Sequence, residues 1–128
     1  VWKRRYKHVL DFEAMLAEEG TVIIKLFLNI SKAEQKKRLE SRLQDPDKLW
    51  KFCMDDLDDR NRWDEFQTAY QDLIEKTSTP EAPWYIIPAD RKWYRNLVVA
   101  RLMVEKLRHL QLSLPTPNFD PASIIIPD

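Results

Sequence analysis

A nearly continuous apolar run, TVIIKLFLNI at residues 21–30, most constrains the fold of this chain. A half-exposed strand alternates apolar and polar side chains, whereas this run is apolar at almost every position. That pattern is typical of a parallel strand covered on both faces. Ser31 and Glu34 follow in the spacing of a capping box, with Ser31 interpreted as a plain N-cap, and predict a helix through Leu43. The segment therefore runs from a strand through a polar strand end into a helix. This order is typical of α/β nucleotide-binding folds, whose ligands lie beyond the carboxyl ends of the strands.

The rest of the chain is predicted to be mostly helical, with one more short strand. Amphipathic periodicity predicts helices at residues 1–19, 65–77 and 91–110, the last with Asp90 as its N-cap. The segment WYII at residues 84–87 predicts a second buried strand, closed by Pro88. Because two parallel strands alone cannot make a covered sheet, we expect the chain to be half of an α/β domain.

A densely charged stretch lies between these strands, RLESRLQDPDKLWKFCMDDLDDRNRW at residues 38–63. Asp45 and Pro46 break it, since proline favours the first position of a helix and the preceding Asp suits its N-cap. From Pro46 we predict one continuous helix, anchored by the apolar side chains of Trp50, Cys53, Met54 and Leu57. Its other face would carry Lys48, Lys51, Asp55, Asp59 and Arg62.

This hinged basic element has two interpretations. With the guanidinium groups of Arg38 and Arg42 just before the break, it is suited to close over an anionic ligand with several phosphates. The charge pattern alone favours a solvated helix face held by salt bridges, because the acids in the stretch roughly balance the bases.

Composition excludes several classes of protein. Equal numbers of basic and acidic residues, 21 each, argue against a nucleic-acid binder. One cysteine excludes an internal disulfide and fits a reducing compartment. The sequence also shows no apolar run of membrane-spanning length and no signal peptide. We therefore expect a cytoplasmic protein without membrane contact. Gly20 is the single glycine, so the sequence holds no glycine-rich phosphate loop.

Three segments together resemble the type 2 polyphosphate kinases, a family of P-loop phosphotransferases related in fold to thymidylate kinase. They are FLNISKAEQKKRLESRLQDPDKLWKF at residues 27–52, DDRNRWDEFQTAY at 58–70 and TSTPEAPWYIIPADRKWYRN at 77–96. The resemblance implies that residues 1–112 are the C-terminal half of a P-loop three-layer α/β/α domain, with a lid at about 38–63 and mostly helical crossovers. Residues 113–128 are expected to form an extended tail.

The resemblance also implies an activity, namely transfer of a phosphoryl group between inorganic polyphosphate and AMP or ADP with Mg²⁺. The implied phosphate contacts are Arg42, Lys48, Lys51 and Arg60, with Arg38 as a weaker candidate. Asp55 and Asp59 would hold those bases in place, and Asp90 would cap the final helix or, less favoured, touch the nucleotide. A homo-oligomer is expected, and no catalytic or metal-binding residue is assigned to this segment.

The sequence departs from the family pattern in one large respect. The G-x-D-x-x-G-K loop and the aspartate-arginine motif that precede this region in the family are not in the printed sequence. We therefore expect the chain to be inactive alone, with Mg²⁺ bound mainly by residues outside it. Two alternatives stay open, a non-catalytic fragment that binds polyphosphate or a partner, and a structural helical module.

Overall fold

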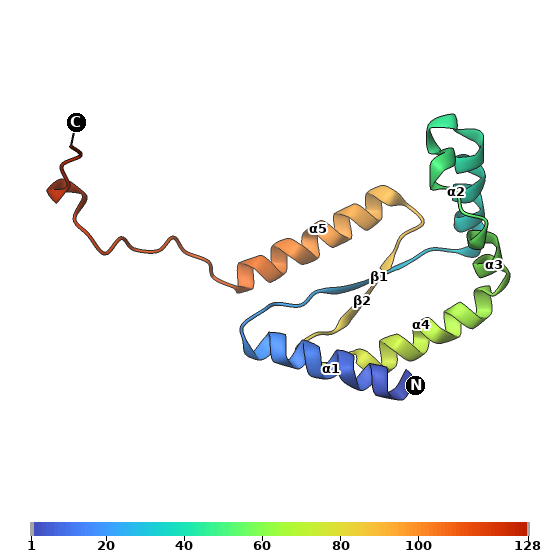
Figure 1. Ribbon diagram of the computed structural model, residues 1–128, viewed down its shortest axis with the longest axis horizontal. Coiled ribbons are helices and arrows are strands. Elements are labelled where there is room, and N and C mark those ends of the chain that lie inside the picture. The colour runs from blue at the N-terminus through green and yellow to red at the C-terminus, as the bar shows by residue number, and fades with distance from the viewer. Residues whose placement is uncertain (1, 128) are drawn as a thin grey trace.

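The computed structural model of the protein describes residues 2–127, and Figure 1 shows their arrangement. In chain order the elements are α1 (Trp2–Glu18), β1 (Lys25–Asn29), α2 (Lys32–Gln44), the 3₁₀ helix η1 (Pro46–Lys51), α3 (Asp55–Asn61), α4 (Trp63–Thr77), β2 (Trp84–Pro88), α5 (Lys92–His109) and the 3₁₀ turn η2 (Pro121–Ser123). The predicted helices at 65–77 and 91–110 are confirmed within two residues. The predicted helix at 1–19 is α1, although residue 1 lies outside the described residues.

The two strands pair in parallel, as predicted, in a register that runs from Lys25 opposite Trp84 to Asn29 opposite Pro88. The amide of Ala89 donates to the carbonyl of Asn29 at 2.8 Å and extends the pairing by one bond. β1 is shorter than the predicted strand at residues 21–30 because its partner begins only at Trp84, directly after Pro83, which has no N–H to donate.

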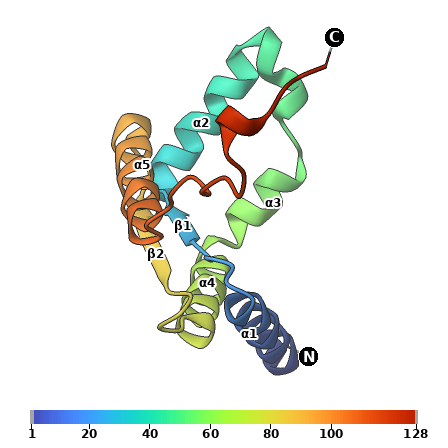
Figure 2. The ribbon, with the colours of Figure 1, turned by 90° about the vertical axis from the view of Figure 1, so that its left-hand side faces the viewer.

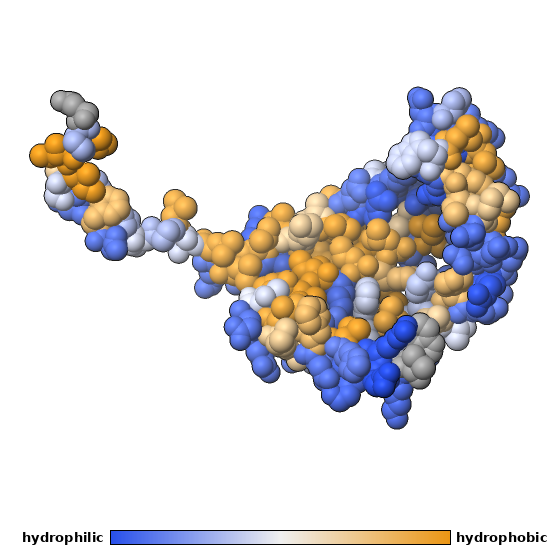
Figure 3. All heavy atoms as spheres, in the orientation of Figure 1, coloured by the Kyte–Doolittle hydropathy of each residue, from blue (hydrophilic) through white to orange (hydrophobic). Residues whose placement is uncertain are grey.

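Helices lie on both sides of the sheet. Figures 1 and 2 show the strands between α5 on one side and the pair of α1 and α4 on the other. Tyr70 of α4 contacts Phe27 of β1 with 5.1 Å between ring centroids. Leu28 and Ile86 are nevertheless about half exposed, so the described residues alone do not fully cover the two strands, as expected for half of an α/β domain. Apolar side chains are also exposed along α5 and in the tail (Figure 3).

A buried polar cluster joins four elements at the amino end of the sheet. Lys25, which is 8% exposed, pairs with Glu13 of α1 at 2.7 Å, and Glu13 is 13% exposed. The ammonium group of Lys25 also donates to the carbonyl of Thr77 at the end of α4. The hydroxyl of Thr77 in turn accepts from the indole N–H of Trp84 at 2.9 Å. This cluster fixes the start of both strands against α1 and α4.

The charged stretch is not the continuous helix that periodicity predicts. Phe52 has extended backbone angles (φ −90°, ψ 128°) and separates η1 from α3. The helical rotation of about 100° per residue is therefore interrupted at residue 52. As a result, the predicted anchoring face is not formed. Trp50 and Met54 are 78% and 69% exposed, and Cys53 is exposed. No helix in residues 2–127 is both long enough and apolar enough to cross a membrane.

Candidate functional site

The carboxyl ends of both strands meet at the first turn of α2. Ser31 is the N-cap of this helix, as predicted, and its hydroxyl accepts from the amide of Glu34 at 3.1 Å. Its own amide donates to a carboxylate oxygen of Asp90 at 2.7 Å. The turn after β1 is thereby joined to the turn after β2, although the two residues are 59 positions apart in the sequence.

Asp90 does not cap α5, so that prediction is wrong. The N-cap of α5 is Arg91, which makes no side-chain cap bond. The backbone amide of Ser31, its side chain and the charge of Arg38, in that order of effect, hold the pKa of Asp90 below its usual 3.8. The carboxylate therefore serves the start of α2, a contact that the local sequence around Asp90 does not reveal.

Arg38 completes this network from the middle of α2. Its Nε donates to Glu34 at 2.8 Å, and Nη2 donates to the carbonyls of Ala89 at 2.7 Å and Asp90 at 3.3 Å. The side chain is 24% exposed. Hydrogen bonds between a guanidinium and carbonyls of another segment hold the two segments at a fixed distance.

Two more arginines connect the parts of the charged stretch. Arg60 of α3 donates through Nη1 to the carbonyl of Lys32 at 2.7 Å and to the side chain of Gln35 at 2.8 Å. Arg42 near the end of α2 makes longer contacts, 3.5 Å to the carbonyl of Lys51 and 3.4 Å to the carboxylate of Asp56. Arg60 therefore ties α3 to α2 more firmly than Arg42 does.

The two lysines of η1 lie at the exposed far end of this element. Lys48 pairs with Asp45 and holds the pKa of Asp45 below its usual 3.8. The ammonium group of Lys51 lies 5.0 Å from the centre of the exposed Trp50 ring. The predicted supporting acids, Asp55 and Asp59, are not the ones that contact the predicted bases in the described residues. Asp45, Asp56 and Glu34 do so instead.

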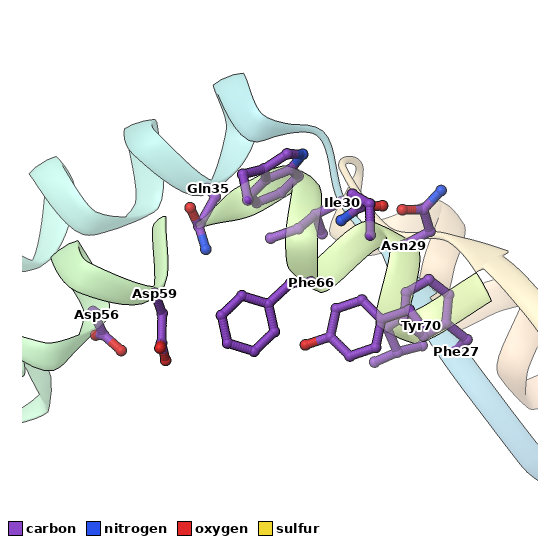
Figure 4. A pocket seen from close by; sticks show the side chains of 11 residues that line it. Phe27, Asn29, Ile30, Gln35, Asp56, Asp59, Phe66 and Tyr70 are labelled. Atoms are coloured by element: carbon purple, nitrogen blue, oxygen red, sulfur yellow. The ribbon is translucent and has the colours of Figure 1, made fainter. Parts of the chain in front are cut away.

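A cleft of about 410 Å³ opens beside the carboxyl end of β1 (Figure 4). Asn29 and Ile30 from the end of β1, Gln35 of α2 and the aromatic side chains of Phe27, Phe66 and Tyr70 line it together with Leu28, Trp63 and Gln67. Asp56 and Asp59 of α3 lie side by side at one end in Figure 4. Aromatic and amide groups suit an uncharged planar ligand, whereas the two carboxylates disfavour a bare polyanion.

The structure thus separates two kinds of side chain that the sequence mixes. Carboxylates of α3 line the cleft, whereas Arg42, Lys48 and Lys51 are not among its lining residues, and only Arg42 of these three contacts one of those carboxylates, Asp56. Asp56 and Gln35 were missed from the sequence because acidic and amide residues on a charged helix carry no motif. Nowhere in residues 2–127 do three or more acidic, His or Cys side chains gather so that they could hold a metal ion.

A sequence profile of the polyphosphate kinase 2 family matches residues 1–114. The chain belongs to the polyphosphate kinase 2 family. The crystal structure of Polyphosphate Kinase 2 from Arthrobacter aurescens TC1 superposes with a TM-score of 0.91 at 50% identity, over 94% of this chain and 43% of that one. The α/β fold is therefore that of the family.

Two curated relatives extend the comparison. The AMP/ADP-polyphosphate phosphotransferase of Meiothermus ruber is 52% identical over 98% of this chain and 47% of its own length. An uncharacterized protein of Leptolyngbya boryana is 47% identical over 91% of this chain and 85% of its own length. The chain spans about half the length of the polyphosphate phosphotransferase from Meiothermus, but most of the Leptolyngbya protein.

Proposed function

We propose that this chain is part of a polyphosphate–nucleotide phosphotransferase that moves a phosphoryl group between inorganic polyphosphate and AMP or ADP. In this proposal the charged stretch is the lid, and its exposed cations contact the phosphates. Support comes from the polyphosphate kinase 2 family match and from the name of the Meiothermus relative. Phosphoryl transfer depends mainly on positioning and on charge neutralisation, which lysine and arginine provide.

The observation that carries the proposal is the arrangement of cations at the far end of α2 and η1. Lys48 is about half exposed, and Arg42 is held only by contacts of 3.4 Å and longer. Replacing the partner in an exposed ion pair by a phosphate oxygen costs little free energy, because such pairs contribute little to stability. A new charge-assisted hydrogen bond to phosphate contributes more binding free energy. The cleft beside them suits the nucleoside better than the polyanion, because the carboxylates of Asp56 and Asp59 line one end of it.

Magnesium is proposed to be held by residues outside this sequence. Within residues 2–127, no group of three or more acidic, His or Cys side chains could hold the ion. Homo-oligomerisation and a cytoplasmic location stay predictions from the sequence. A fragment that binds polyphosphate without catalysis stays the second candidate, since the printed sequence holds no glycine-rich phosphate loop.

Binding of an end-labelled polyphosphate, measured by fluorescence anisotropy at 50 and 200 mM salt, tests the proposal. We expect salt-sensitive binding by the chain, and weaker binding when Lys48→Ala and Lys51→Ala are combined. Log affinity falls as log salt rises, and the loss of two phosphate contacts should make this negative slope less steep by roughly one to two. The matched control combines Lys3→Ala and Lys7→Ala on α1, which changes the net charge by the same amount outside the charged stretch.

Equal affinity of the double variant and the control would contradict a lid role and support a solvated helix face. A coupled assay separates the two candidate functions. Nucleotide phosphorylation by this chain alone would overturn the expectation that it is inactive by itself. If it is inactive, a G-x-D-x-x-G-K loop followed by an aspartate-arginine motif, encoded upstream of Val1 within roughly one more half-domain, would support the phosphotransferase, and unrelated sequence there would support the binding fragment.

A further inference from the structure

Four side chains tie the carboxyl ends of β1 and β2 to the base of α2. They are Ser31, Glu34, Arg38 and Asp90, and we refer to them as the strand-end clamp. The clamp spans the turn after β1, the first two turns of α2 and the turn after β2. It lies at the base of the helix whose other end carries Arg42 and leads into η1.

The guanidinium of Arg38 is engaged within the chain on both of its bidentate edges. These edges are Nε–Nη2 and Nη1–Nη2, and Nη2, which belongs to both, donates to the carbonyls of Ala89 and Asp90, while Nε donates to Glu34. A phosphate bound in the fork-to-fork manner needs one whole edge. Arg38 would have to release the turn after β2 before it could bind phosphate in this way.

Asp90 occupies the position that an anionic ligand would need at the start of α2. Amides at a helix N-terminus are a favourable site for phosphate. Here the carboxylate of Asp90 already accepts from the amide of Ser31 at 2.7 Å, and the hydroxyl of Ser31 accepts from the amide of Glu34. The charged members of the clamp therefore neutralise groups of the chain itself.

We propose that Arg38 and Asp90 are positioning residues that fix the base of α2 and so direct the cations at its far end, and that Arg38 is not a phosphate contact. The 13 residues of α2 make a helix roughly 20 Å long, so a tilt of about 10° at its base moves its end by roughly 3 Å. The consequence for phosphate rests on the proposed function, because it presumes that Arg42, Lys48 and Lys51 bind polyphosphate.

Amide hydrogen exchange tests the clamp without any ligand. We expect Asp90→Ala to speed exchange at the amide of Ser31 about tenfold, because a bond to a charged acceptor is lost. Arg38→Gln should speed exchange at the amide of Ala89, which donates to Asn29 beside the clamp. Glu40→Ala, a change of exposed charge on the same helix, is the control and should leave both amides unchanged.

Polyphosphate affinity gives a second test of the clamp. If Asp90 acts by positioning, its removal weakens binding, whereas if it acts only through its charge, its removal strengthens binding. Asp90→Ala removes a negative charge, so electrostatics alone predicts tighter binding of a polyanion, as in the Glu40→Ala control. The clamp predicts about threefold weaker binding instead. Arg38→Lys keeps the charge but cannot span Glu34, Ala89 and Asp90, so it should bind as weakly as Arg38→Gln.

The clamp hypothesis and the proposed function are contradicted by different results. Unchanged exchange at both amides overturns the clamp whether or not polyphosphate binds. Tighter binding by Asp90→Ala, or wild-type affinity in Arg38→Lys, overturns the positioning role of the clamp. Wild-type affinity in Arg38→Lys together with weaker binding in Arg38→Gln restores Arg38 as a phosphate contact. Absence of salt-sensitive binding by the wild-type chain defeats the proposed function, while the exchange rates still decide whether the clamp holds.

Discussion

The two ends of the sheet are joined by charged networks of different character. At the amino end, Lys25, Glu13 and Thr77 are enclosed by α1, α4 and β2, and each charged group has a partner within the cluster. At the carboxyl end, Arg38 and Asp90 join turns that border on solvent. The same strands are thus tied by buried charged groups at one end and by partly exposed charged groups at the other, where ligands of α/β folds lie.

The difference shows why charge alone does not identify the functional end. A buried ion pair gives little net stability compared with apolar packing, yet it is costly to break because the remaining charge is uncompensated. An exposed pair costs little to make or break and can exchange its partner for a ligand. Arg42 and Lys48 belong to the second kind, whereas Lys25 belongs to the first.

The largest effect is expected at the amino end. Glu13→Ala leaves the ammonium group of Lys25 buried against the carbonyl of Thr77 and the ring of Trp84. We expect a loss of about 3–5 kcal/mol in the free energy of unfolding, measured by urea titration. Glu13→Leu combined with Lys25→Met is the matched control and should recover most of the loss, because no charge is left buried. A double variant as unstable as Glu13→Ala would contradict this account.

A smaller effect is expected at the N-cap of α2. Ser31→Ala removes the hydroxyl that accepts from Glu34 but keeps the amide that donates to Asp90. The expected loss in the free energy of unfolding is about 1 kcal/mol, and Ser31→Asn should retain most of the stability because Asn also caps well. The urea midpoint measures both. A loss as large as that of Glu13→Ala would contradict the expectation that breaking a contact at the exposed carboxyl end costs less than breaking one at the buried amino end.

Local patterns predicted the elements at both ends but not the contacts that join them. Ser31 and Glu34 are three residues apart, and their capping bond follows from the sequence. The bonds of Lys25 to Thr77 and of Ser31 to Asp90 span 52 and 59 residues, and only the paired strands bring these groups together. No short motif encodes such distances, so the role of Asp90 was misjudged from its position before α5.

The break inside the charged stretch was missed for a different reason. Neither proline nor glycine marks Phe52, whose extended backbone ends η1, so the helical period seemed to continue through residue 62. The apolar side chains that the period placed on an anchoring face are exposed instead, as Trp50 and Met54 show. Periodicity identifies which face of a helix is apolar only where the helix itself is unbroken.

The smallest effect is the pH dependence of the strand-end clamp. Because the pKa of Asp90 in the folded chain is lowered from 3.8 by Ser31 and Arg38, the folded state favours the charged carboxylate. Its contribution to stability is complete above pH 3.8 and is lost as the pH falls through the lower folded value. We therefore expect the wild-type chain to exceed Asp90→Asn in stability at pH 6, with a difference that shrinks below pH 3.8.

Urea midpoints of the two chains, taken at intervals from pH 6 down to about pH 2, measure this difference. Asp120→Asn in the tail removes a carboxylate outside the clamp and should follow the wild-type curve. Since Asp90 is solvent-exposed, the difference should be smaller than the loss from Ser31→Ala. A gap between wild type and Asp90→Asn that stays constant to the lowest pH would show that the amide of Ser31 responds to the shape of the Asp90 side chain and not to its charge.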